Sequence, residues 1–468
     1  MAQLLFILYL LSVIGGIVIV LGEERSAVSS IPWILVVIFL PVVGLLLYII
    51  FGYSLRRKQL IDVEVRQALS DAPVETKSLP STEAEEVADL KLTSLSALIE
   101  RLTDTPLTTA NELTHYDDSR EWLVACRDAI AQAQHYIYIE LYRIEEGPWL
   151  DALLDLLAER IQEGVALYWL YDDVGSRSLS RRYRKRMEQL GGQVAAFLPV
   201  RFRLLTSRVN YRNHRNLVVV DGAVGFTGGN VLLSELQHLP QGAQPLATTH
   251  LRISGLAVRQ LEYSFALDWY VAAQQLLSPQ QSSSTMTTAE PIKMQIFPTH
   301  PTDDFPSLEM ILTQAFLQAR QSLYIESPVL IPTNSIQQAL ISTALSGVQV
   351  RVILPRRGRS WLAPKASHAF FTDLLRAGVE IYYYDGLREA TYAVIDKECV
   401  VTGTPYLDFR SFEYNFDLTT IAYSTEVAQQ FVDSFETTLA LCHRIALRRN
   451  RLWRRIAHGV MRLLTPLI

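Results

Sequence analysis

The sequence is poor in cysteine. Its 468 residues include three, Cys126, Cys399 and Cys442, which are odd in number and far apart along the chain. Such spacing argues against a disulfide framework and against the clustered ligands of a structural zinc site. We therefore expect a protein of a reducing compartment. About half of the residues are apolar, so the chain can form more than two domains with sizeable cores.

The start of the chain lacks the features of a cleaved signal peptide. No basic residue precedes the apolar run at 4–21, and no A-x-A cleavage site follows it. A second apolar run covers 31–51, and each run has about the 20 residues that a bilayer crossing needs. Three basic residues follow the second run at 56–58, whereas the loop between the runs is mainly acidic. We predict a transmembrane helical hairpin at 1–60 with the main domain in the cytoplasm.

An internal repeat organises the rest of the chain. Residues 211–230 run from a basic turn through an apolar strand to Asp221 and then to a Gly-Gly pair, and residues 381–404 repeat this order around Asp396. The likeness continues upstream, where three segments pair with three others: 129–142 with 315–328, 160–173 with 343–356, and 189–199 with 374–385. Each copy reads strand, helix, strand, helix, strand, hairpin. We predict two α/β half-domains, 110–279 and 292–442, related by a pseudo-twofold axis.

The flanking segments are more polar. Residues 61–109 contain prolines and an acidic run, which predicts a linker with some helix rather than a core. The last 26 residues, 443–468, hold seven arginines and no acid, with apolar and basic faces at helical spacing. A basic amphipathic helix of this kind suits an anionic membrane surface, and a solvated helix docked on the core is the alternative. Nucleic acid is not expected as a partner, because no aromatic-basic interleaving accompanies the arginines elsewhere.

The repeated unit resembles the HxKxxxxD signature of the phospholipase D superfamily, and the whole arrangement resembles the bacterial cardiolipin synthases. The segments that carry the likeness are FLPVVGLLLYIIFG (39–52), YDDVGSR (171–177), HRNLVVVDG (214–222), THLRISGLAV (249–258) and LDFRSFEYNFD (407–417). Together they extend over nearly the full chain. The resemblance implies a single site between two phospholipase D-like halves.

In that family one histidine attacks a lipid phosphate and forms a phosphohistidine, while the other protonates the leaving glycerol oxygen. Lysine and asparagine side chains hold the phosphate oxygens, where charge develops during transfer. The resemblance implies phosphatidyl transfer between two phosphatidylglycerols, giving cardiolipin and glycerol. It also implies a multi-pass protein of the bacterial inner membrane that needs neither a metal nor another cofactor.

The family's site residues map onto this chain with several departures. The expected catalytic set is His214, Asp221, Glu389 and Asp396, in which Glu389 occupies the second histidine position. The expected substrate-binding residues are Asn216, Gly228, Gly229, Asn230, Thr391, Gly403 and Thr404. Asn216 and Thr391 occupy the two lysine positions, and Tyr406 occupies an asparagine position. The second histidine and both lysines are therefore missing.

These departures predict impaired catalysis. Losing one preorganised donor costs roughly 10²–10³ in rate. An ionised Glu389 would repel a phosphate, although a carboxyl group with a raised pKa could serve as a general acid. The alternative is an inactive lipid-binding or regulatory partner of an active cardiolipin synthase, so a second membrane protein of lipid synthesis joins phospholipid and membrane as an expected partner. A third interpretation, nuclease-type cleavage on the same scaffold, fits the membrane anchor poorly.

Further residues of the matching segments have less specific expected roles. We expect Arg212 and Arg215 to lie in a solvated turn, and His250 to be a buried histidine with its hydrogen bonds satisfied. Asp172 and Asp173 follow a strand, where they would either contact a ligand or cap the turn. A supporting role through hydrogen bonds and an ion pair is expected for Asp408, Arg410, Ser411 and Asn415.

Overall fold

A computed structural model describes residues 2–22, 27–48, 93–200, 207–229, 247–277, 291–357 and 362–447, together with residues 456, 459, 461 and 462. Asn230, one of the expected substrate-binding residues, lies outside this part of the chain, as does most of the expected C-terminal helix.

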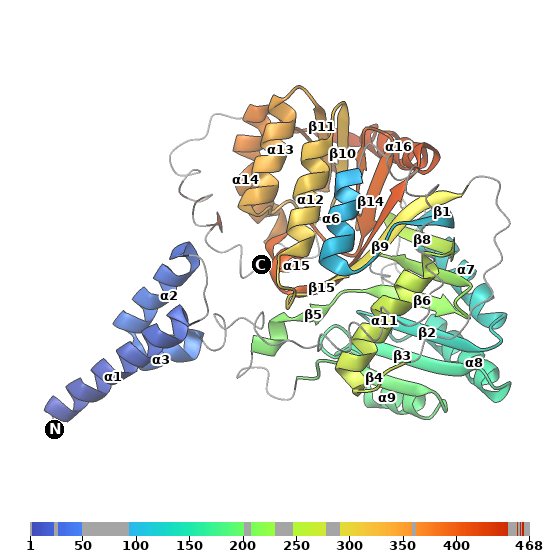
Figure 1. Cartoon of the computed structure of the whole chain (residues 1–468), viewed down its shortest axis with the longest axis horizontal. Helices are drawn as coiled ribbons and strands as arrows, with labels where there is room; N and C mark the ends of the chain where they lie inside the picture. Colours follow the sequence, from blue (N-terminus) through green and yellow to red (C-terminus); the bar gives the residue numbers. More distant parts are fainter. Residues whose placement is uncertain are drawn as a thin grey trace.

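One continuous sheet carries both halves (Figure 1). The strands of the first half are β1 (Thr108–Asp118), β2 (Tyr136–Leu141), β3 (Ala166–Asp172), β4 (Gln193–Phe197), β6 (Asn216–Val220), β7 (Val224–Gly228) and β8 (Ala247–Gly255). Those of the second half are β9 (Ile292–Thr299), β10 (Ser322–Glu326), β11 (Gln349–Pro355), β12 (Glu380–Tyr384), β13 (Tyr392–Ile395), β14 (Cys399–Gly403) and β15 (Asn415–Tyr423). β16 (Cys442–Arg444) extends one edge, and β5 (Arg212–Asn213) pairs with β15.

The strand order shows the internal repeat. From the junction outward, the first half reads β1-β8-β7-β6-β2-β3-β4 and the second reads β9-β15-β14-β13-β10-β11-β12. Each half has three parallel strands, a motif hairpin antiparallel to them, and two further antiparallel strands. The halves join where β1 pairs antiparallel with β9. The mixed α/β architecture predicted from the repeat is therefore confirmed.

Helices cover both faces of the sheet. On one face, α11 (Val258–Ala273) and α16 (Thr425–Leu439) pack into a single hydrophobic core that draws residues from both halves. On the other face each half has a core of its own, beneath helices α7 (Ser119–Ala131), α8 (Pro148–Gln162) and α9 (Arg181–Glu188) in the first half and α12 (Ser307–Gln318), α13 (Asn334–Leu345) and α14 (Ala363–Ala377) in the second. Two short elements lie near the motifs, the 3₁₀-helix η4 (Ser207–Asn210) and helix α15 (Phe409–Glu413).

Two segment boundaries differ from those expected. The last part of the expected polar linker forms α6 (Thr93–Thr103), whose Leu95 and Ile99 are fully buried in the core of the second half. Its apolar residues recur at helical spacing, which the polar composition of the wider segment obscured. The expected tail helix cannot begin at 443, because residues 442–444 pair with β12 as β16.

The N-terminal apolar runs form three helices, α1 (Ala2–Leu21), α2 (Ala27–Phe39) and α3 (Pro41–Leu47), which stand apart from the α/β body in Figure 1. The second expected span is interrupted, because Leu40 leaves the helical conformation (φ −135°, ψ 69°) and Pro41 starts a new helix. Within the described ranges, no helix combines the length and the apolar character that a membrane crossing requires.

Candidate functional site

The two motifs meet at the boundary between the halves. His214 lies just before β6 and Glu389 just before β13, so both are at the carboxyl ends of the parallel strands of their half. The amide of His214 donates to the carbonyl of Phe416 in the other half over 2.9 Å. A Cβ atom built on Gly229 would lie 3.5 Å from the carbonyl oxygen of Glu389. Both motif loops therefore face the other half, as in an open α/β sheet that binds a ligand between its strand ends.

His214 is a neutral, partly buried imidazole. Its ring centroid lies 4.1 Å from that of Tyr142, and its Nδ1 atom lies 3.1 Å from Nδ2 of Asn415. Burial lowers the pKa of His214 to about 3, and the positive charges of Arg410 and Arg212 add to this effect. The side chain is consequently uncharged at neutral pH.

The second motif presents a carboxyl group at the equivalent position. Glu389 is 2% exposed, and its Oε2 accepts a hydrogen bond of 2.6 Å from the hydroxyl of Tyr406. Tyr406 is the residue at the expected asparagine position. A phenol therefore holds the carboxyl group that replaces the second imidazole.

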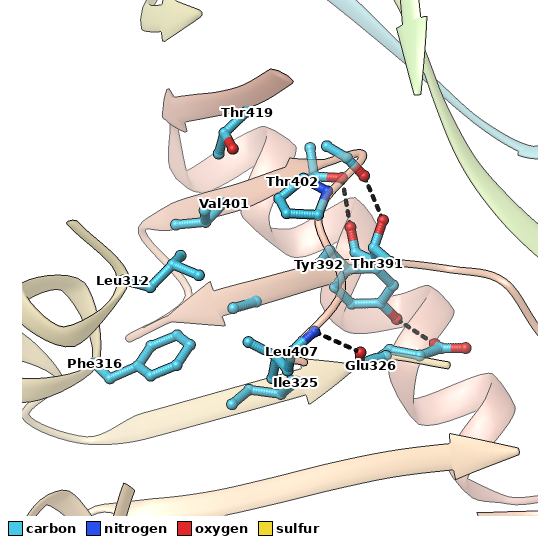
Figure 2. Close-up of a pocket in the computed structure, with 14 residues that line it drawn as sticks. Leu312, Phe316, Ile325, Glu326, Thr391, Tyr392, Val401, Thr402, Leu407 and Thr419 are labelled. Atoms are coloured by element: carbon cyan, nitrogen blue, oxygen red, sulfur yellow. Dashed lines mark hydrogen bonds between the residues drawn. The ribbon is translucent and has the colours of Figure 1, made fainter. Parts of the chain in front are cut away.

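The side chains at both lysine positions form hydrogen bonds with the protein's own backbone. Asn216 accepts a hydrogen bond of 3.1 Å from the amide of Tyr142 and donates to the carbonyl of His214 over 3.3 Å. The hydroxyl of Thr391 donates to the carbonyl of Gly403. Thr391 also lines a cavity of about 40 Å³ between β13 and α12, which has room for water but not for a lipid head group (Figure 2). Neither side chain replaces the charge of a lysine.

The motif aspartates lie at the far ends of their strands. Asp221 follows β6, roughly 20 Å along the strand from His214. Its carboxylate accepts from the amides of Gln134, His135 and Tyr136 over 2.7–2.8 Å. The expected catalytic assignment of Asp221 is therefore wrong in position, because the carboxylate anchors the start of β2 instead of facing the site.

Asp396 makes the equivalent contacts in the second half. It accepts from the amides of Arg320, Gln321 and Ser322, at the start of β10, over 2.7–3.1 Å. Both aspartates have a φ of 52°, a left-handed conformation that aspartate tolerates better than most residues. The expected catalytic position of Asp396 is corrected in the same way as that of Asp221.

Two of the expected substrate-binding glycines are also required by the backbone conformation and by close packing. Gly228 has a φ of 152°, and a Cβ atom there would lie 2.4 Å from the carbonyl oxygen of Thr249. Gly403 has a φ of 157°, and its Cβ atom would lie 2.2 Å from the carbonyl oxygen of Leu418. Each glycine lets the motif hairpin end closely against the next strand. Thr404 is buried, and its hydroxyl donates to Asp417 over 2.6 Å.

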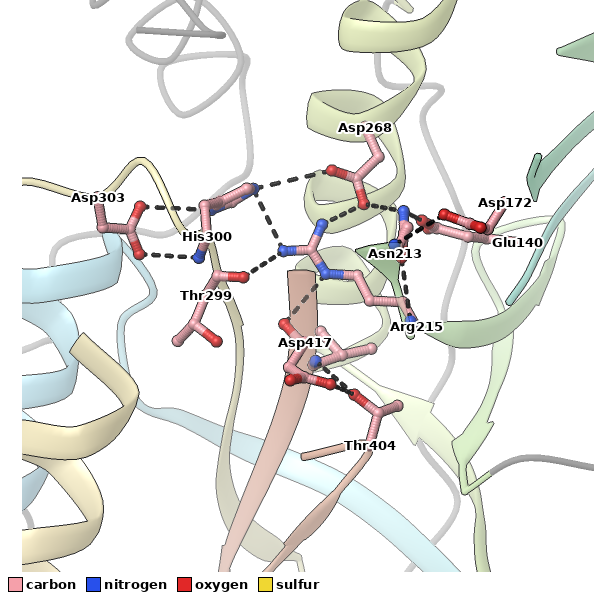
Figure 3. Close-up of polar contacts among 11 residues, drawn as sticks. Glu140, Asp172, Asn213, Arg215, Asp268, Thr299, His300, Asp303, Thr404 and Asp417 are labelled. Atoms are coloured by element: carbon pink, nitrogen blue, oxygen red, sulfur yellow. Dashed lines mark hydrogen bonds and ion pairs between the residues drawn. The ribbon is translucent and has the colours of Figure 1, made fainter. Parts of the chain in front are cut away.

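Arg215, beside His214, joins the two halves (Figure 3). It is fully buried, forms an ion pair with Asp268 on α11, and donates to the carbonyls of Thr299 (3.0 Å) and Asp417 (3.1 Å) in the second half. Burial alone would raise the pKa of Asp268, but the charge of Arg215 together with hydrogen bonds to His300 and Glu140 lowers that pKa.

The expectation of a solvated turn is wrong for both arginines. Arg212 is 2% exposed and pairs with Asp172 at 3.3 Å. Asp172 also accepts hydrogen bonds from the amides of Val174 and Gly175, which caps the turn after β3. The same carboxylate therefore caps this turn and holds Arg212 of the motif loop. Burial raises the pKa of Asp172, and the charge of Arg212 opposes that rise.

A second repeated contact was missed at the level of sequence. The residue before each motif position donates to a glutamate on the adjacent parallel strand: Asn213 to Glu140 on β2, and Arg388 to Glu326 on β10. Burial beside Asp268 raises the pKa of Glu140. The repeated segments 129–142 and 315–328 place a glutamate at equivalent positions, so the aligned copies contained the signal.

Arg410 has a role beyond the supporting one expected from the sequence, because its charge acts on the site. It lies on α15, is half-buried, and donates to the carbonyl of Asn210 over 3.3 Å. Its charge acts on both His214 and Tyr142. His250 is fully buried as expected, with Nε2 3.0 Å from the hydroxyl of Ser119, but its Nδ1 forms no hydrogen bond with the described residues, so its hydrogen bonds are only partly satisfied. Asp408 caps α15 through the amide of Ser411.

Comparisons with known proteins agree with this architecture. Residues 312–439 match the family described as "Cardiolipin synthase, PLD-like domain", and residues 5–52 match "Phospholipase D-nuclease N-terminal". A cardiolipin synthase of Halalkalibacterium halodurans is 31% identical over 97% of this chain and 91% of its own length. The chain belongs to the bacterial cardiolipin synthases of the phospholipase D superfamily.

Other members of the cardiolipin synthase family extend over the same length. The major cardiolipin synthase ClsA of Bacillus subtilis is 29% identical over 99% of both chains. The crystal structure of a phosphatidylserine synthase from Haemophilus influenzae has a similar fold, with a TM-score of 0.57 at 11% identity, and covers 80% of this chain and 97% of its own. The overall fold is thus shared with that protein.

Proposed function

We propose that this member of the cardiolipin synthase family binds the phosphodiester head group of an anionic phospholipid, of the phosphatidylglycerol type, and has lost most of the phosphatidyl-transfer activity. On this proposal it serves as a lipid-binding or regulatory partner of an active cardiolipin synthase. The observation that carries the proposal is that neither of the two lysine positions holds a positively charged side chain. Asn216 and Thr391 are neutral, and their side chains bond to the protein's own backbone.

The charge around the site favours binding over transfer. A transferred phosphoryl group needs several preorganised cations and donors around its oxygens. Arg410 supplies positive charge beside His214, so an anionic head group has one attractive partner there. Glu389 at the second histidine position adds a carboxyl group that would resist the charge developing in the reaction.

The N-terminal helices support action at a membrane. They expose large apolar side chains, among them Leu11 (61%), Val18 (63%) and Phe39 (77%). Exposed apolar surface of this extent is stable only against lipid or another apolar partner. We place the protein at the bacterial inner membrane with its α/β body on the cytoplasmic side, as the charge bias around 56–58 favours.

Residual phosphatidyl transfer is the second candidate function. It is favoured by the low pKa of His214, about 3, because a nucleophilic imidazole must be unprotonated. Glu389, or water, would then take the place of the missing general acid. Both candidates use the same side chains, His214 and Glu389, and the same lipid.

Lipid analysis separates the two candidates. The full chain is expressed in a bacterium that lacks its own cardiolipin synthases, and cardiolipin is measured beside a His214→Ala control. The proposed function predicts no cardiolipin above the control and co-purification of phosphatidylglycerol or of a cardiolipin synthase. Cardiolipin that appears with the intact chain and vanishes in His214→Ala would instead establish residual transfer.

A further inference from the structure

The loop and helix that follow β3 carry a cluster of exposed basic side chains. We call it the first basic surface, and its members are Arg177, Arg181, Arg182 and Lys185. None of the four forms an ion pair with another residue of the described ranges. Three neighbouring acids are instead neutralised by the other two arginines of α9. Arg186 pairs with Asp151 and Asp155, and Arg184 pairs with Asp173. The four positive charges therefore face solvent.

The equivalent segment of the second half is basic as well. β11 is the middle of the three parallel strands of its half, as β3 is in the first. The segment after β11 holds the second basic surface, whose exposed members are Arg356, Arg357 and Lys365. Arg356 pairs with Asp385 at 3.1 Å, and Lys365 lies in the first turn of α14. The internal repeat thus places one basic surface at the same position of each half.

Both surfaces lie at the edge of the sheet where the motifs meet. They follow the carboxyl ends of β3 and β11, and His214 and Glu389 lie at the carboxyl ends of the same two sets of parallel strands. Side-chain contacts connect the first surface to the site. The hydroxyl of Ser176, next to Arg177, donates to the carbonyl of Tyr142 over 3.3 Å. The ring of Tyr142 in turn lies 4.1 Å from that of His214.

The first basic surface also has a fixed shape. Arg184 donates to the carbonyls of Ser176 (3.0 Å) and Leu179 (3.3 Å), which ties α9 to the loop before it. Gly175 packs so closely on the carbonyl of Tyr142 that a Cβ atom there would overlap it. Such a preformed surface can bind without first ordering a flexible segment.

From this arrangement we infer that the two basic surfaces dock the α/β body on an anionic phospholipid surface, with the edge that carries His214 and Glu389 turned toward the lipid. The whole chain has a formal net charge of −5, so attraction to an anionic leaflet has to come from local clusters of positive charge. Each basic side chain near such a leaflet strengthens binding about fivefold. The inference rests on the proposed location at the membrane and not on head-group binding at His214.

The orientation can be measured on the full chain in vesicles. A fluorescent label is attached at Ser178→Cys, in the loop of the first basic surface, or at Gln162→Cys, at the opposite edge of the same half, and both positions are exposed. The vesicles carry a quencher on their head groups and contain phosphatidylcholine alone or in equal parts with phosphatidylglycerol. The wild-type chain, treated with the same label, gives the background from the native cysteines.

Phosphatidylglycerol should bring the first basic surface to the lipid. We expect it to increase the quenching of the label at position 178 at least about twofold. The difference should vanish in about 1 M salt, where the screening length falls to about 3 Å. The label at position 162 should not distinguish the two lipids. Equal quenching at position 178 in both kinds of vesicle would overturn the inference.

Charge variants identify the side chains responsible. The extra quenching should be lost in the first-surface variant, Arg177→Gln, Arg181→Gln, Arg182→Gln and Lys185→Gln, and reduced in the second-surface variant, Arg356→Gln, Arg357→Gln and Lys365→Gln. The matched control replaces three exposed arginines and one exposed lysine elsewhere by glutamine, namely Arg101, Arg127, Arg320 and Lys397. An equal loss in the control would assign the effect to net charge, and undiminished quenching in the second-surface variant would show that the docking is not paired. Either result would overturn the inference.

The remaining outcomes separate this inference from the proposed function. A chain that does not float with either kind of vesicle would refute the membrane location and the inference together. Duplex DNA that binds the full chain in detergent, but not the first-surface variant, would assign this surface to nucleic acid if the two lipids quench equally. His214→Ala should keep the quenching and lose binding of glycerophosphoglycerol, a water-soluble phosphodiester head group. Wild-type protein that docks but does not bind this head group would refute the proposed function alone.

Discussion

The hydroxyl of Tyr406 donates to Oε2 of Glu389 over 2.6 Å, and this pair stands where the family pattern has an asparagine and a histidine. The second motif has therefore exchanged an imidazole for a carboxyl group and an amide for a phenol. The two replacement side chains form a hydrogen bond with each other, so the carboxyl group of Glu389 has a hydrogen-bond donor without a ligand.

Restoring the motif residues should restore transfer. The variant Asn216→Lys, Thr391→Lys and Glu389→His returns both cations and the general acid to the site. Because each preorganised donor accounts for roughly 10²–10³ in rate, we expect cardiolipin in a synthase-deficient strain to rise at least tenfold above the wild-type chain. The measurement is cardiolipin per unit of membrane protein.

The control adds His214→Ala to the restored chain and should remove the gain. Equal cardiolipin with and without His214 would show that the activity does not arise at this site. If the restored chain folds but makes no more cardiolipin than the wild-type chain, the loss of the lysines and of the second histidine is not what limits the reaction.

Arg410 should account for much of the affinity for an anionic head group. Hydrogen bonds to charged groups contribute about 1.5–3 kcal/mol, so Arg410→Gln is expected to weaken binding of glycerophosphoglycerol about tenfold or more. Arg127→Gln, on the exposed face of α7, changes the net charge equally and should leave the affinity unaltered. Equal losses in both variants would indicate a general charge effect instead of a local contact.

The two motif aspartates should matter for stability and not for binding. Asp221→Ala removes the acceptor for three backbone amides, and we expect a loss of about 2 kcal/mol with a lower Tm. Asp221→Asn keeps one acceptor and the left-handed backbone, so its loss should be smaller. Asp396→Ala is expected to behave like Asp221→Ala. Folded variants that keep their Tm but lose head-group affinity would contradict this structural role.

Asp417 should make stability depend on pH. Burial raises its pKa to about 7 in the folded protein, well above the ordinary value of 3.8. The folded state therefore holds a proton that the unfolded state has released, and this contribution is complete below about pH 4 and lost as pH rises through 7. We expect Asp417→Asn to flatten the decline of Tm between pH 5 and 7. An identical decline in both proteins would assign the effect to other groups.

The repeat was the most informative feature of the sequence. It predicted the order of strands and helices in both halves, because each copy repeats the same apolar runs and glycine stops around Asp221 and Asp396. It also brought the loops of His214 and Glu389 to the boundary between the halves. Equivalent elements of related halves occupy equivalent places, so this part of the inference needed no knowledge of side-chain packing.

Long-range packing explains the failures. Arg212 and Arg215 lie in a polar segment that suggests solvent, yet both are buried by residues of distant elements, for example Asp268 and Thr299 around Arg215. The same holds for Asn415, whose partner His214 is 201 positions away. Local composition gives no information about such contacts. Pro41, by contrast, was a local signal that the second apolar run would break.

The junction of β1 with β9 fixes how the site can admit a ligand. Since backbone hydrogen bonds continue from one half to the other, the halves cannot hinge apart without breaking the sheet. A half produced alone would carry a bare edge strand and would pair with another copy of itself. Access of a lipid head group to His214 must then depend on rearranged loops, and the spacing between His214 and Glu389 is set by the sheet and not by the ligand.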